Sequence, residues 1–598
     1  MIEHQGARAP TSLDHALLRY PTTEGRRWLE FRHPIETITA WSLDEVIPAL
    51  TRAEAAQQSG HWVVGMVSYD AGPAFDAAIV SRRHLRCPLV AFGVFDGADA
   101  SRGPAGTDID LGEITTSRTF DQYRRDLQRV RHHIGAGDSY QVNYTMRLRA
   151  DFAGDPLGLF EALVRAQRGD HVAYLDLGDQ VVASASPELF LRRRGDLIET
   201  RPMKGTRPRH PDPVVDRDLA EAVLASPKDR AENTMIVDMT RNDLGRIADI
   251  GSVEVTSLHT VESYPTVHQL TSTVTARSSA SLVEIFRACF PAASITGAPK
   301  VRTTALIADL EHDPRGVYTG AIGALAPDGS FEFNVAIRTA HIDLVESSVE
   351  YGVGGGIVWD SRIEDEWVEA HDKARVLERA HTPFRLLETM AWEPGVGAVL
   401  LDRHLERLSD SAQYFGFDID TTEIRRLVEA VTADVPTTLR LLVAGDGAID
   451  LEQQPRPDPP ADPWPVAIDG VAVDSTDEFL RHKTTRRQRY QQARDRFPDH
   501  ADVLLINERG EVTESTMANV VVDLGGRLLT PPTSAGLLPG TFRAELLESG
   551  LIEEATIGVD DLENADRLFL INSVRGWIPA ELTTTASATG PSPLSANR

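Results

Sequence analysis

Pro383 interrupts the chain directly after a helical pattern, and this break constrains the fold more than any other feature of the sequence. The helical stretch IEDEWVEAHDKARVLERA ends before the proline, and a strand pattern begins near Phe384. A chain of 598 residues is also too long for a single hydrophobic core. We therefore predict one domain over residues 1–380 and another over residues 384–582, followed by a low-complexity, disordered tail over residues 583–598.

Strand and helix patterns alternate before the break. Strands that end in glycine turns are predicted for HWVVGMVSYDAG and LVAFGVFDG, and an amphipathic helix for FDQYRRDLQRVRHHIGAGD. Short alternating runs with Gly-Asp turns predict an antiparallel meander in VAYLDLGDQVVASASPELFLRRRGDLIETRPMKG. A hairpin and a further strand are predicted for YTGAIGALAPDGSFEFNVAIRTAHID. The fold class is therefore α+β, with large antiparallel sheets.

The part after the break has its own order of elements. We predict a helix in LDRHLERLSDSAQYFG, a strand in TTLRLLVAG, and an acidic, proline-rich connector in LEQQPRPDPPADPWP. No internal repeat relates this part to the first.

Charge and cysteine content limit the class of protein. The formal net charge is −28, from 61 Lys and Arg against 89 Asp and Glu, which opposes binding to nucleic acid or anionic lipid. The two cysteines, Cys87 and Cys289, form no metal or redox motif. No apolar signal region opens the chain, and no apolar run is long enough for a bilayer. We expect a cytoplasmic protein without a membrane or nucleic-acid partner.

A basic stretch, ETRPMKGTRPRHP, places Lys204 among Arg201, Arg207 and Arg209. Such a cluster is a solvated loop, a cradle for an anion, or the setting of a reactive amine. Like charge and burial both lower the pKa of a lysine, and the neutral amine is a nucleophile.

Carboxylates recur at helical spacing in two segments. Asp229 and Glu232 are three residues apart in SPKDRAENTMIVDMTRNDLG, and Glu366, Glu369 and Lys373 share one face of IEDEWVEAHDK. Two such helices offer the oxygen ligands that Mg²⁺ prefers. Solvated helix faces with i, i+4 ion pairs explain the same spacing, so these residues alone leave both interpretations open.

The ordered blocks GDSYQVNYTMRL, SPELFLR, TRPMKGTRPR, KDRAENTMIVDMTRNDLG, FPAASITGAPKVR, YTGAIG, FNVAIRTA and GGGIVWDSRIEDEWVEAHDKA resemble the chorismate-utilising enzymes. That family includes component I of anthranilate synthase and of aminodeoxychorismate synthase, and the isochorismate and salicylate synthases. The resemblance covers roughly residues 40–380. Anthranilate synthases usually have alanine where this chain has Lys204, and the water-using synthases usually have lysine at the position of Gln141. The first domain therefore resembles aminodeoxychorismate synthase component I.

This resemblance implies roles for individual residues. Lys204 would attack C2 of chorismate as the C4 hydroxyl leaves, protonated by Glu188, and ammonia would then add at C4 and expel the lysine. Glu232 and Glu369 match the Mg²⁺ ligands, with Asp229 and Glu366 in supporting positions. The other matches are Tyr318 and Arg338 for the pyruvyl carboxylate, and Thr296, Gly297, Lys373 and His268 for the lining of the site. His268 could equally be a structural histidine. Arg338 is expected inside an otherwise apolar strand, which disfavours a plain surface role, and Lys300 is interpreted as structural.

The source of ammonia is a second expectation. A glutaminase needs a cysteine nucleophile, and neither Cys87 nor Cys289 lies in a nucleophile elbow. Ammonia must therefore come from solution or from a separate glutamine amidotransferase subunit.

The blocks LDRHLERLSDSAQYFGF, LRLLVAGDG, HKTTRRQRYQQAR, INERGEVTESTMANVVV and LLTPPTSAGLLPGTFR resemble the fold-type IV pyridoxal-phosphate enzymes over about residues 384–582. This family includes branched-chain and D-amino-acid aminotransferases and 4-amino-4-deoxychorismate lyase, and it implies a two-lobed domain. Lys483 matches the lysine that bonds to the cofactor, and Glu514 the carboxylate that faces the pyridine nitrogen.

The remaining matches concern the phosphate and the substrate. Arg407 matches the phosphate-pairing arginine, and Gly540, Thr541 and Phe542, at a predicted helix start, match a phosphate cup. Arg440 is a candidate for a substrate carboxylate, although Arg407 and Arg440 could be ordinary surface arginines. The segment INSVRGW, with Asn572 and Ser573, departs from the Ser-Gly-Thr loop of aminotransferases and is closer to the lyases.

The order of the two domains suggests consecutive reactions. The leading hypothesis is a bifunctional enzyme that makes p-aminobenzoate, the folate precursor, from chorismate and ammonia. An alternative is an aminodeoxychorismate or anthranilate synthase fused to a true aminotransferase in a specialised pathway. The third hypothesis is a non-catalytic scaffold for an amidotransferase. The presence of all the expected catalytic residues argues against it, namely Glu188, Glu232, Glu369, Lys483 and Glu514. Fold-type IV relatives favour a homodimer through the second domain.

Overall fold

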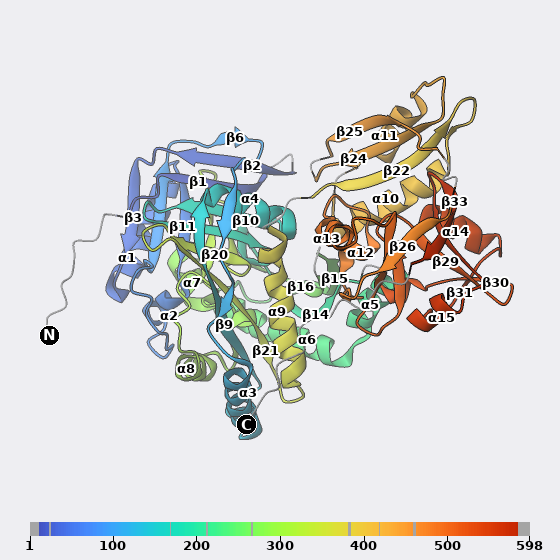
Figure 1. Ribbon diagram of the computed structural model, residues 1–598. Helices are drawn as coiled ribbons and strands as arrows, with labels where there is room; N and C mark the ends of the chain where they lie inside the picture. The colour runs from blue at the N-terminus through green and yellow to red at the C-terminus, as the bar shows by residue number, and fades with distance from the viewer. Residues whose placement is uncertain are drawn as a thin grey trace. The chain divides into compact units, whose positions relative to one another are not determined.

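The computed structural model describes residues 11–22, 25–167, 169–210, 213–264, 267–380, 384–417, 419–445, 447–458 and 462–583 (Figure 1). The chain divides into two compact units, one of Met1–Arg209 with Arg217–Pro383 and one of His210–Asp216 with Phe384–Arg598. We call them the first and the second unit. Of the predicted tail, Thr583 donates its backbone N–H to Val466 at 3.0 Å, and residues 584–598 lie outside the described residues.

Two large sheets form the centre of the first unit, and their strands pair antiparallel throughout. The 11-stranded sheet contains, in spatial order, β17 (Gly297–Ala298), β9 (Gln141–Gly154), β21 (Ser348–Ile357), β20 (Thr339–Asp343), β11 (Gln180–Ser186), β10 (His171–Asp176), β1 (His15–Thr22), β2 (Gly25–Arg32) and β6 (Asp99–Ser101), and β7 (Ile109–Leu111) and β8 (Thr115–Thr116) pair with β9. The 10-stranded sheet contains β14 (Met203–Pro208), β16 (Val267–Arg277), β13 (Leu197–Arg201), β12 (Leu189–Arg194), β19 (Phe331–Val335), β18 (Ala321–Leu325), β4 (Trp62–Val67), β5 (Val90–Phe95) and β3 (Glu36–Ala40), and β15 (Glu254–Ser263) pairs with β16.

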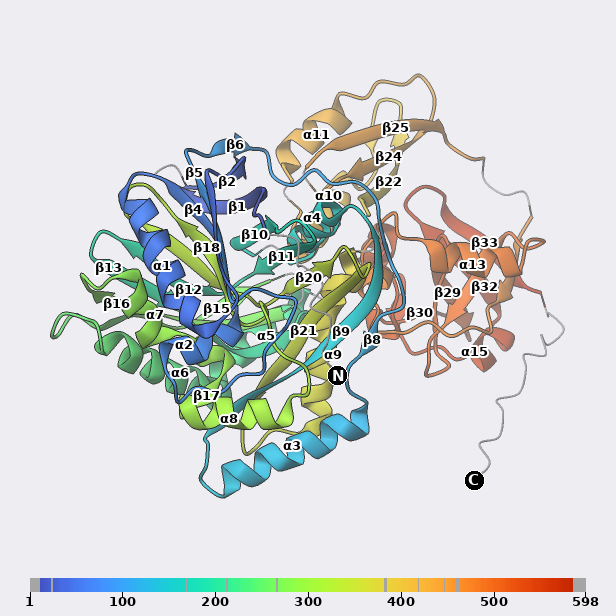
Figure 2. The ribbon, with the colours of Figure 1, turned by 90° about the vertical axis from the view of Figure 1, so that its left-hand side faces the viewer.

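Alternation along the strands places apolar side chains on both faces of each sheet. In β1, Ala16 and Leu18 enter a core between the two sheets, where they meet Met66 of β4, while Leu17 enters the opposite core. Helices cover the outer faces of the sheets (Figure 2). Their apolar side chains pack against those of the sheets in two buried clusters. The 10-stranded sheet is covered by α1 (Leu43–Gln58), α6 (Pro227–Gly245) and α7 (Leu282–Cys289), and the 11-stranded sheet by α3 (Phe120–Gly135), α4 (Pro156–Gln167), α8 (Lys300–Leu310) and α9 (Ile363–Ala380). The first unit is therefore a helix–sheet–sheet–helix sandwich, which also contains the short helix α2 (Gly72–Phe75). Helix α5 (Pro213–Ala225) begins in the segment assigned to the second unit and continues in the first.

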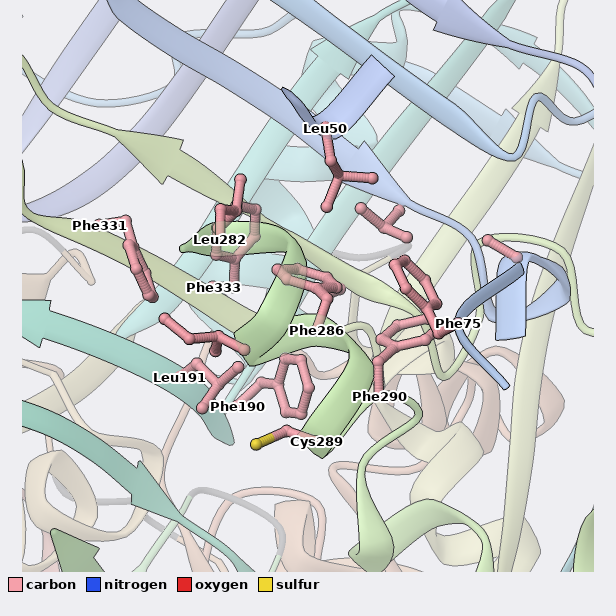
Figure 3. Close-up of a cluster of buried hydrophobic side chains, with 14 of the residues drawn as sticks. Leu50, Phe75, Phe190, Leu191, Leu282, Phe286, Cys289, Phe290, Phe331 and Phe333 are labelled. Carbon is pink, nitrogen blue, oxygen red and sulfur yellow. The ribbon is translucent and has the colours of Figure 1, made fainter. Parts of the chain in front are cut away.

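Aromatic side chains fill the core beneath α1 and α7 (Figure 3). Phe286 of α7 contacts Phe333 of β19 edge-on, with ring centroids 5.4 Å apart, and Leu50 of α1 is fully buried in the same cluster. Close packing of this kind fixes the helices on the sheet.

Truncation of Leu50 tests this packing. Leu50→Ala should lower the free energy of unfolding of the first unit by about 2–5 kcal/mol, because the lost methyl groups leave a cavity. Leu85→Ala is the matched control, since Leu85 is 70% exposed, and it should change that free energy by less than about 0.5 kcal/mol. Denaturant unfolding of the full chain measures both, and equal effects would contradict the assignment of Leu50 to the core.

The second unit has two lobes. A four-stranded sheet of β23 (Gly397–Ala398), β22 (Leu386–Glu393), β24 (Thr437–Val443) and β25 (Ile449–Pro455) is packed against α10 (Leu401–Phe415) and α11 (Thr421–Glu429). The eight-stranded sheet contains β28 (Val512–Ser515), β27 (Asp502–Ile506), β26 (Trp464–Ile468), β33 (Gly576–Leu582), β32 (Arg567–Asn572), β29 (Asn519–Leu524), β30 (Arg527–Thr530) and β31 (Glu553–Glu554). Its helices are α12 (Glu478–Arg481), α13 (Gln488–Arg496), α14 (Thr541–Glu548) and α15 (Val559–Glu563). The predicted α+β fold with large antiparallel sheets and a two-lobed second part is confirmed.

Three local expectations differ from the structure. The predicted meander is two hairpins, because β10–β11 belongs to one sheet and β12–β13 to the other. The predicted proline-rich connector begins with a strand, since β25 pairs with β24 along its whole length. Arg338 lies between β19 and β20 with a left-handed backbone, φ 52°, and not inside a strand.

Candidate active sites

Most of the charged residues predicted for the first domain line one pocket of the first unit. This first pocket has a volume of about 130 Å³ and is walled by β14, β21, α6 and α9. The predicted residues that line it are Glu188, Lys204, Asp229, Glu232, Tyr318, Arg338, Glu366, Glu369 and Lys373. Segments more than 150 residues apart in the chain, such as those of Lys204 and Glu366, thus supply its walls.

The position of Lys204 results from a bulge in β14. The pairing of β14 with β16 shifts between Met203 and Thr206, and a bulge of this kind redirects a side chain. Gly205 allows the bulge because its backbone has φ 83°, which favours glycine. A Cβ at this position would also lie only 2.9 Å from Cβ of Asp229. The Lys204 side chain therefore points into the pocket.

Burial governs the charge of Lys204. Burial is the largest cause of the lowered pKa of the Lys204 amine. The negative charge of Glu232 raises this pKa, and the positive charge of Lys373 lowers it further. The neighbouring arginines are engaged elsewhere: Arg201 pairs with Glu262, Arg207 with Asp229 at 2.7 Å, and Arg209 donates to Tyr264 O at 2.8 Å. The reactive-amine interpretation of the basic stretch thus rests on burial more than on the arginines.

Glu188 is the buried carboxyl of the pocket. It lies between β11 and β12, is 3% exposed, and accepts a hydrogen bond from Ser294 Oγ at 2.5 Å. Burial raises the pKa of Glu188 to about 7, although Ser294 and Lys204 act in the opposite direction. A carboxyl with this pKa is protonated for a large fraction of the time near neutral pH, as a general acid must be.

The four remaining carboxylates differ in their partners. Burial raises the pKa of Glu232 to about 7, and burial followed by the charge of Glu369 raises the pKa of Glu366. Burial opposes ionisation of Glu369, but Lys373, with Nζ at 2.7 Å, lowers its pKa. Asp229 is paired with Arg207 at 2.7 Å, as Glu369 is with Lys373.

This donor set fits a hard cation. Glu232, Glu366 and Glu369 offer only carboxylate oxygens. Burial raises the pKa of Glu232 and Glu366, and a bound cation would favour their charged forms. Among the described residues, however, no three His, Cys, Asp or Glu side chains converge on one metal position. Mg²⁺ needs few protein ligands when substrate carboxylate and water complete its shell, so the chemistry of the residues fits Mg²⁺.

Tyr318 and Arg338 line the pocket as well. Gly352 of β21 faces the ring of Tyr318, and a Cβ there would lie 2.4 Å from ring atoms. Arg147, 1% exposed on β9, has its guanidinium 4.9 Å from the centroid of that ring. Arg338 donates from Nη1 to Lys373 O at 2.6 Å. Sequence reasoning missed Arg147 and Gly352, and the signal was an arginine within the apolar alternation of QVNYTMRL.

Three predicted lining residues lie outside the pocket wall. Thr296 is fully buried and donates from Oγ1 to Ala292 O at 3.0 Å. Gly297, at φ 127°, pairs with Val142 of β9. His268 is 2% exposed, and its Nδ1 lies 2.9 Å from Ser263 Oγ. Their roles in substrate binding stay predictions.

Gln141 and Lys300 occupy contrasting environments. Gln141 is fully buried, and no described residue hydrogen-bonds either atom of its amide. A Cβ at Gly356 would lie 2.7 Å from Gln141 Nε2 and 2.9 Å from Lys204 Nζ, so the two side chains are neighbours. Lys300 donates to Asp243 at 2.8 Å and to Cys289 O at 3.1 Å, in keeping with a structural role.

A second pocket, of about 360 Å³, lies within the second unit. The predicted residues that line it are Arg407, Arg440, Lys483, Glu514, Gly540, Thr541, Asn572 and Ser573. Phe542 instead packs against the apolar cluster between α14 and β32. Apart from Phe542, the residues predicted for the second site line this pocket.

Lys483 and Glu514 both have shifted pKa values in this pocket. Burial, followed by the charge of Arg407, lowers the pKa of Lys483 to about 8. Burial raises the pKa of Glu514 to about 7, although Tyr490 donates to its Oε1 at 2.8 Å and Leu538 N to its Oε2 at 3.2 Å. The site therefore holds a nucleophilic amine and a buried carboxyl without a full countercharge.

Basic and backbone donors gather at the other end of the pocket. Gly540 is the N-cap of α14, and Thr541 is its first residue. Arg407 of α10 donates from Nη1 to Pro539 O at 3.1 Å, directly before this helix start. Arg440 of β24 lies 3.1 Å from Glu452 and is partly exposed. A helix N-terminus beside an arginine is an arrangement that can bind a phosphate.

The residues fit pyridoxal phosphate on these observations. Lys483 suits the aldehyde, Glu514 suits a protonated ring nitrogen as its missing countercharge, and the helix start with Arg407 suits the phosphate. Sequence reasoning missed Tyr490 and Arg487, which also line the pocket. It also missed Glu388, a fully buried carboxylate in an apolar strand, which was itself the signal.

Among the described residues, no helix is both long and apolar enough to cross a membrane. Both cysteines are free thiols in buried positions.

Comparisons with known proteins agree with this geometry. Residues 15–379 match the family described as chorismate binding enzyme, and residues 385–582 match amino-transferase class IV. Aminodeoxychorismate synthase component 1 of Escherichia coli (strain K12) is 42% identical over 346 residues, which cover 53% of this chain and 76% of that protein. The component 1 of Salmonella typhimurium (strain LT2) is 39% identical over 339 residues, which cover 52% of this chain and 74% of that protein.

A solved structure shows the same fold. The crystal structure of anthranilate synthase component I from Streptococcus pneumoniae TIGR4 superposes with a TM-score of 0.51 at 23% identity, covering 63% of this chain and 95% of that one. Since residues 15–379 are more than half of the sequence, the chain belongs to the family of chorismate binding enzymes and carries a class IV aminotransferase domain after it.

Proposed function

We propose that the first unit converts chorismate and ammonia to 4-amino-4-deoxychorismate and water, and that the second unit converts this product to p-aminobenzoate and pyruvate. The observation that carries the proposal is Lys204, a buried amine of lowered pKa in one pocket with Glu188. The similarity to two aminodeoxychorismate synthase components supports it. We assign the two activities to residues 1–380 and 384–582.

The residues of the first pocket divide the amination into two displacements. Lys204 Nζ bonds to C2 of the ring while the C4 hydroxyl leaves as water, with the proton supplied by Glu188. Ammonia then bonds to C4 and displaces the lysine from C2. Tyr318 and Arg338 hold the pyruvyl carboxylate. Glu232 and Glu369 would hold Mg²⁺, which would supply positive charge to offset that of the ring carboxylate.

The neighbour of Lys204 argues for ammonia over water as the final nucleophile. Activation of water needs a base, and the amide of Gln141 is not basic. Its buried oxygen and nitrogen can instead form hydrogen bonds to a small polar molecule beside Lys204.

Glu188 should give the amination an alkaline limit. The protonated carboxyl is the acid, and its pKa is about 7, so kcat/KM should fall towards tenfold per pH unit above that value. Protonation of Lys204 lowers the rate at the acidic end, because only the neutral amine attacks. Glu188→Gln should reduce kcat by about 10³-fold and remove the alkaline limit.

Glu199→Gln is the matched control for this variant. Glu199 lies on the neighbouring strand β13 and pairs with Arg192, outside the pocket. It should keep both the rate and the pH profile. An unchanged alkaline limit in Glu188→Gln would show that another group supplies the proton.

The second unit acts at C4 of the aminodeoxychorismate. Bound pyridoxal phosphate withdraws electrons from the carbon that bears the amine. Lys483 is a neutral base for much of the time at pH 8 and removes the C4 proton. The enolpyruvyl group of the substrate then leaves as pyruvate, and the ring becomes aromatic. Arg440 faces the pocket and binds a substrate carboxylate, while Glu514 keeps its charge opposite the ring nitrogen.

The choice of lyase over aminotransferase rests on residues 571–577. Asn572 Oδ1 accepts backbone N–H groups of Val574 and Arg575 at 3.1 and 2.9 Å, so this loop is closed on itself beside the pocket. The preceding unit also supplies the substrate of a lyase, and tethering raises its effective concentration.

The proposal also covers the partner subunits and the cellular location. The relatives are named component 1, so we propose a separate glutamine amidotransferase subunit as the ammonia source. A homodimer through the second unit and a cytoplasmic location complete the proposal, and two free buried thiols support a reducing environment.

Product analysis tests the function. The purified chain would be incubated with chorismate, Mg²⁺, pyridoxal phosphate and ammonium, and the products separated by mass. Equal amounts of p-aminobenzoate and pyruvate are expected. Anthranilate would overturn the role of Lys204, isochorismate or salicylate would overturn ammonia as the nucleophile, and an amino-acid-dependent product would favour the aminotransferase.

A further inference from the structure

A buried histidine joins the two sides of the proposed phosphate site. His404 of α10 is fully buried, with Nδ1 2.6 Å from Glu388 Oε2 and Nε2 3.3 Å from Thr541 Oγ1. Glu388 also accepts from Arg407, at 2.9 Å from Nε and 2.6 Å from Nη2. One chain of contacts thus runs from Arg407 through Glu388 and His404 to Thr541.

The charge of Glu388 fixes the tautomer of His404. Burial alone would raise the pKa of Glu388, but Arg407 and His404 hold it at about 2, so this carboxylate only accepts hydrogen bonds. Nδ1 of His404 therefore carries a hydrogen. In the neutral imidazole, Nε2 is then a bare acceptor, and the hydroxyl of Thr541 must donate to it.

A phosphate dianion changes this arrangement because it also only accepts. If Thr541 turned its single hydrogen to the phosphate, the buried Nε2 of a neutral His404 would lose its partner, which is costly. If Nε2 carries a proton, it donates to Thr541 Oγ1, and the hydroxyl hydrogen is available to the phosphate.

The charges around His404 permit this switch. Burial, Arg407 and Lys483 lower the pKa of His404 while Glu388 raises it. Three charged groups face His404: Glu388 from β22, Arg407 from the same helix α10, and Lys483 from the segment before α13. The group that faces it from α14, Thr541, is uncharged. A phosphate dianion bound at Arg407 and Thr541 would add negative charge beside Arg407 and Lys483, and this would raise the pKa of His404.

We propose that His404 is a positioning residue that takes up one proton from solvent when the cofactor phosphate binds, so that Thr541 donates its hydrogen bond to that phosphate. This inference rests on the proposed binding of pyridoxal phosphate.

Calorimetry of the full apo-chain at pH 8 tests it, in buffers of different ionisation enthalpy. Pyridoxal phosphate and pyridoxal are the two ligands, so the difference in proton uptake isolates the phosphate, which is already a dianion at this pH. The unmodified protein should take up about one proton more with pyridoxal phosphate. His404→Gln should abolish that difference.

Further variants separate structural from proton-linked effects. Arg403→Ala is the control on the adjacent residue of α10, whose guanidinium pairs with Glu545 at 2.9 Å and with Glu548, and it should keep the full difference. Thr541→Ser should keep it and Thr541→Val should lose it, which preserves the test if His404→Gln does not fold. An equal difference in His404→Gln and the unmodified chain would overturn the inference. Absence of binding by both ligands would instead overturn the proposed cofactor.

Discussion

Lys204→Ala is expected to reduce formation of 4-amino-4-deoxychorismate from chorismate and ammonia by about 10³-fold or more, because it removes the group that bonds to the substrate. The loss should appear in kcat, since Tyr318 and Arg338, which we propose bind the pyruvyl carboxylate, still line the pocket. Steady-state assays with coupled detection of p-aminobenzoate measure it.

The second unit provides the internal control. Lys204→Ala should convert added 4-amino-4-deoxychorismate to p-aminobenzoate at the rate of the unmodified chain, which shows that the second unit is folded. Lys204→Arg should not restore amination, because a guanidinium stays protonated and cannot attack. Retention of amination within about tenfold in Lys204→Ala would indicate direct addition of ammonia without a lysine adduct.

Lys483→Ala should have the opposite effect on the two reactions. Amination should continue, 4-amino-4-deoxychorismate should accumulate, and p-aminobenzoate formation should fall by about 10³-fold or more, since the variant lacks both the amine that bonds to the cofactor and the base at C4. Mass spectrometry after borohydride reduction should find the cofactor attached to the unmodified chain and not to the variant.

Two observations would contradict this expectation. Normal p-aminobenzoate formation in Lys483→Ala would place the second reaction elsewhere in the chain. Loss of amination in the same variant would show that the two units do not act independently. Mixing Lys204→Ala with Lys483→Ala distinguishes these cases, because the intermediate released by one variant is a substrate for the other.

Local sequence patterns predicted the elements that carry the sites. The helix pattern before Pro383 corresponds to α9 from Ile363 to Ala380, and its spacing places Glu366, Glu369 and Lys373 in one pocket. The predicted helix start at Gly540 and Thr541 is confirmed as the N-terminus of α14. These features depend on residues a few positions apart, which a single sequence displays directly.

Long-range features could not be read in the same way. Strands β10–β13 alternate similarly, and nothing in their alternation assigns one pair to each sheet. The polar strand β25 exists because β24 offers its backbone, not because IDLEQQP has a strand pattern. The roles of Glu388 and His404 could not be predicted, because they depend on contacts between β22, α10 and α14.

The pairing of β9 with β21 determines when the first pocket can form. Gly356 pairs with Asn143 and Gly352 with Arg147, so one wall joins strands that are about 200 residues apart in the chain. Closing so long a loop costs entropy before the contacts are made, and such pairings form late in folding. During synthesis, the segment of Lys204 therefore emerges well before β21 and α9 are available to enclose it. The pocket around the Lys204 amine therefore stays incomplete until β21 and α9 have been added.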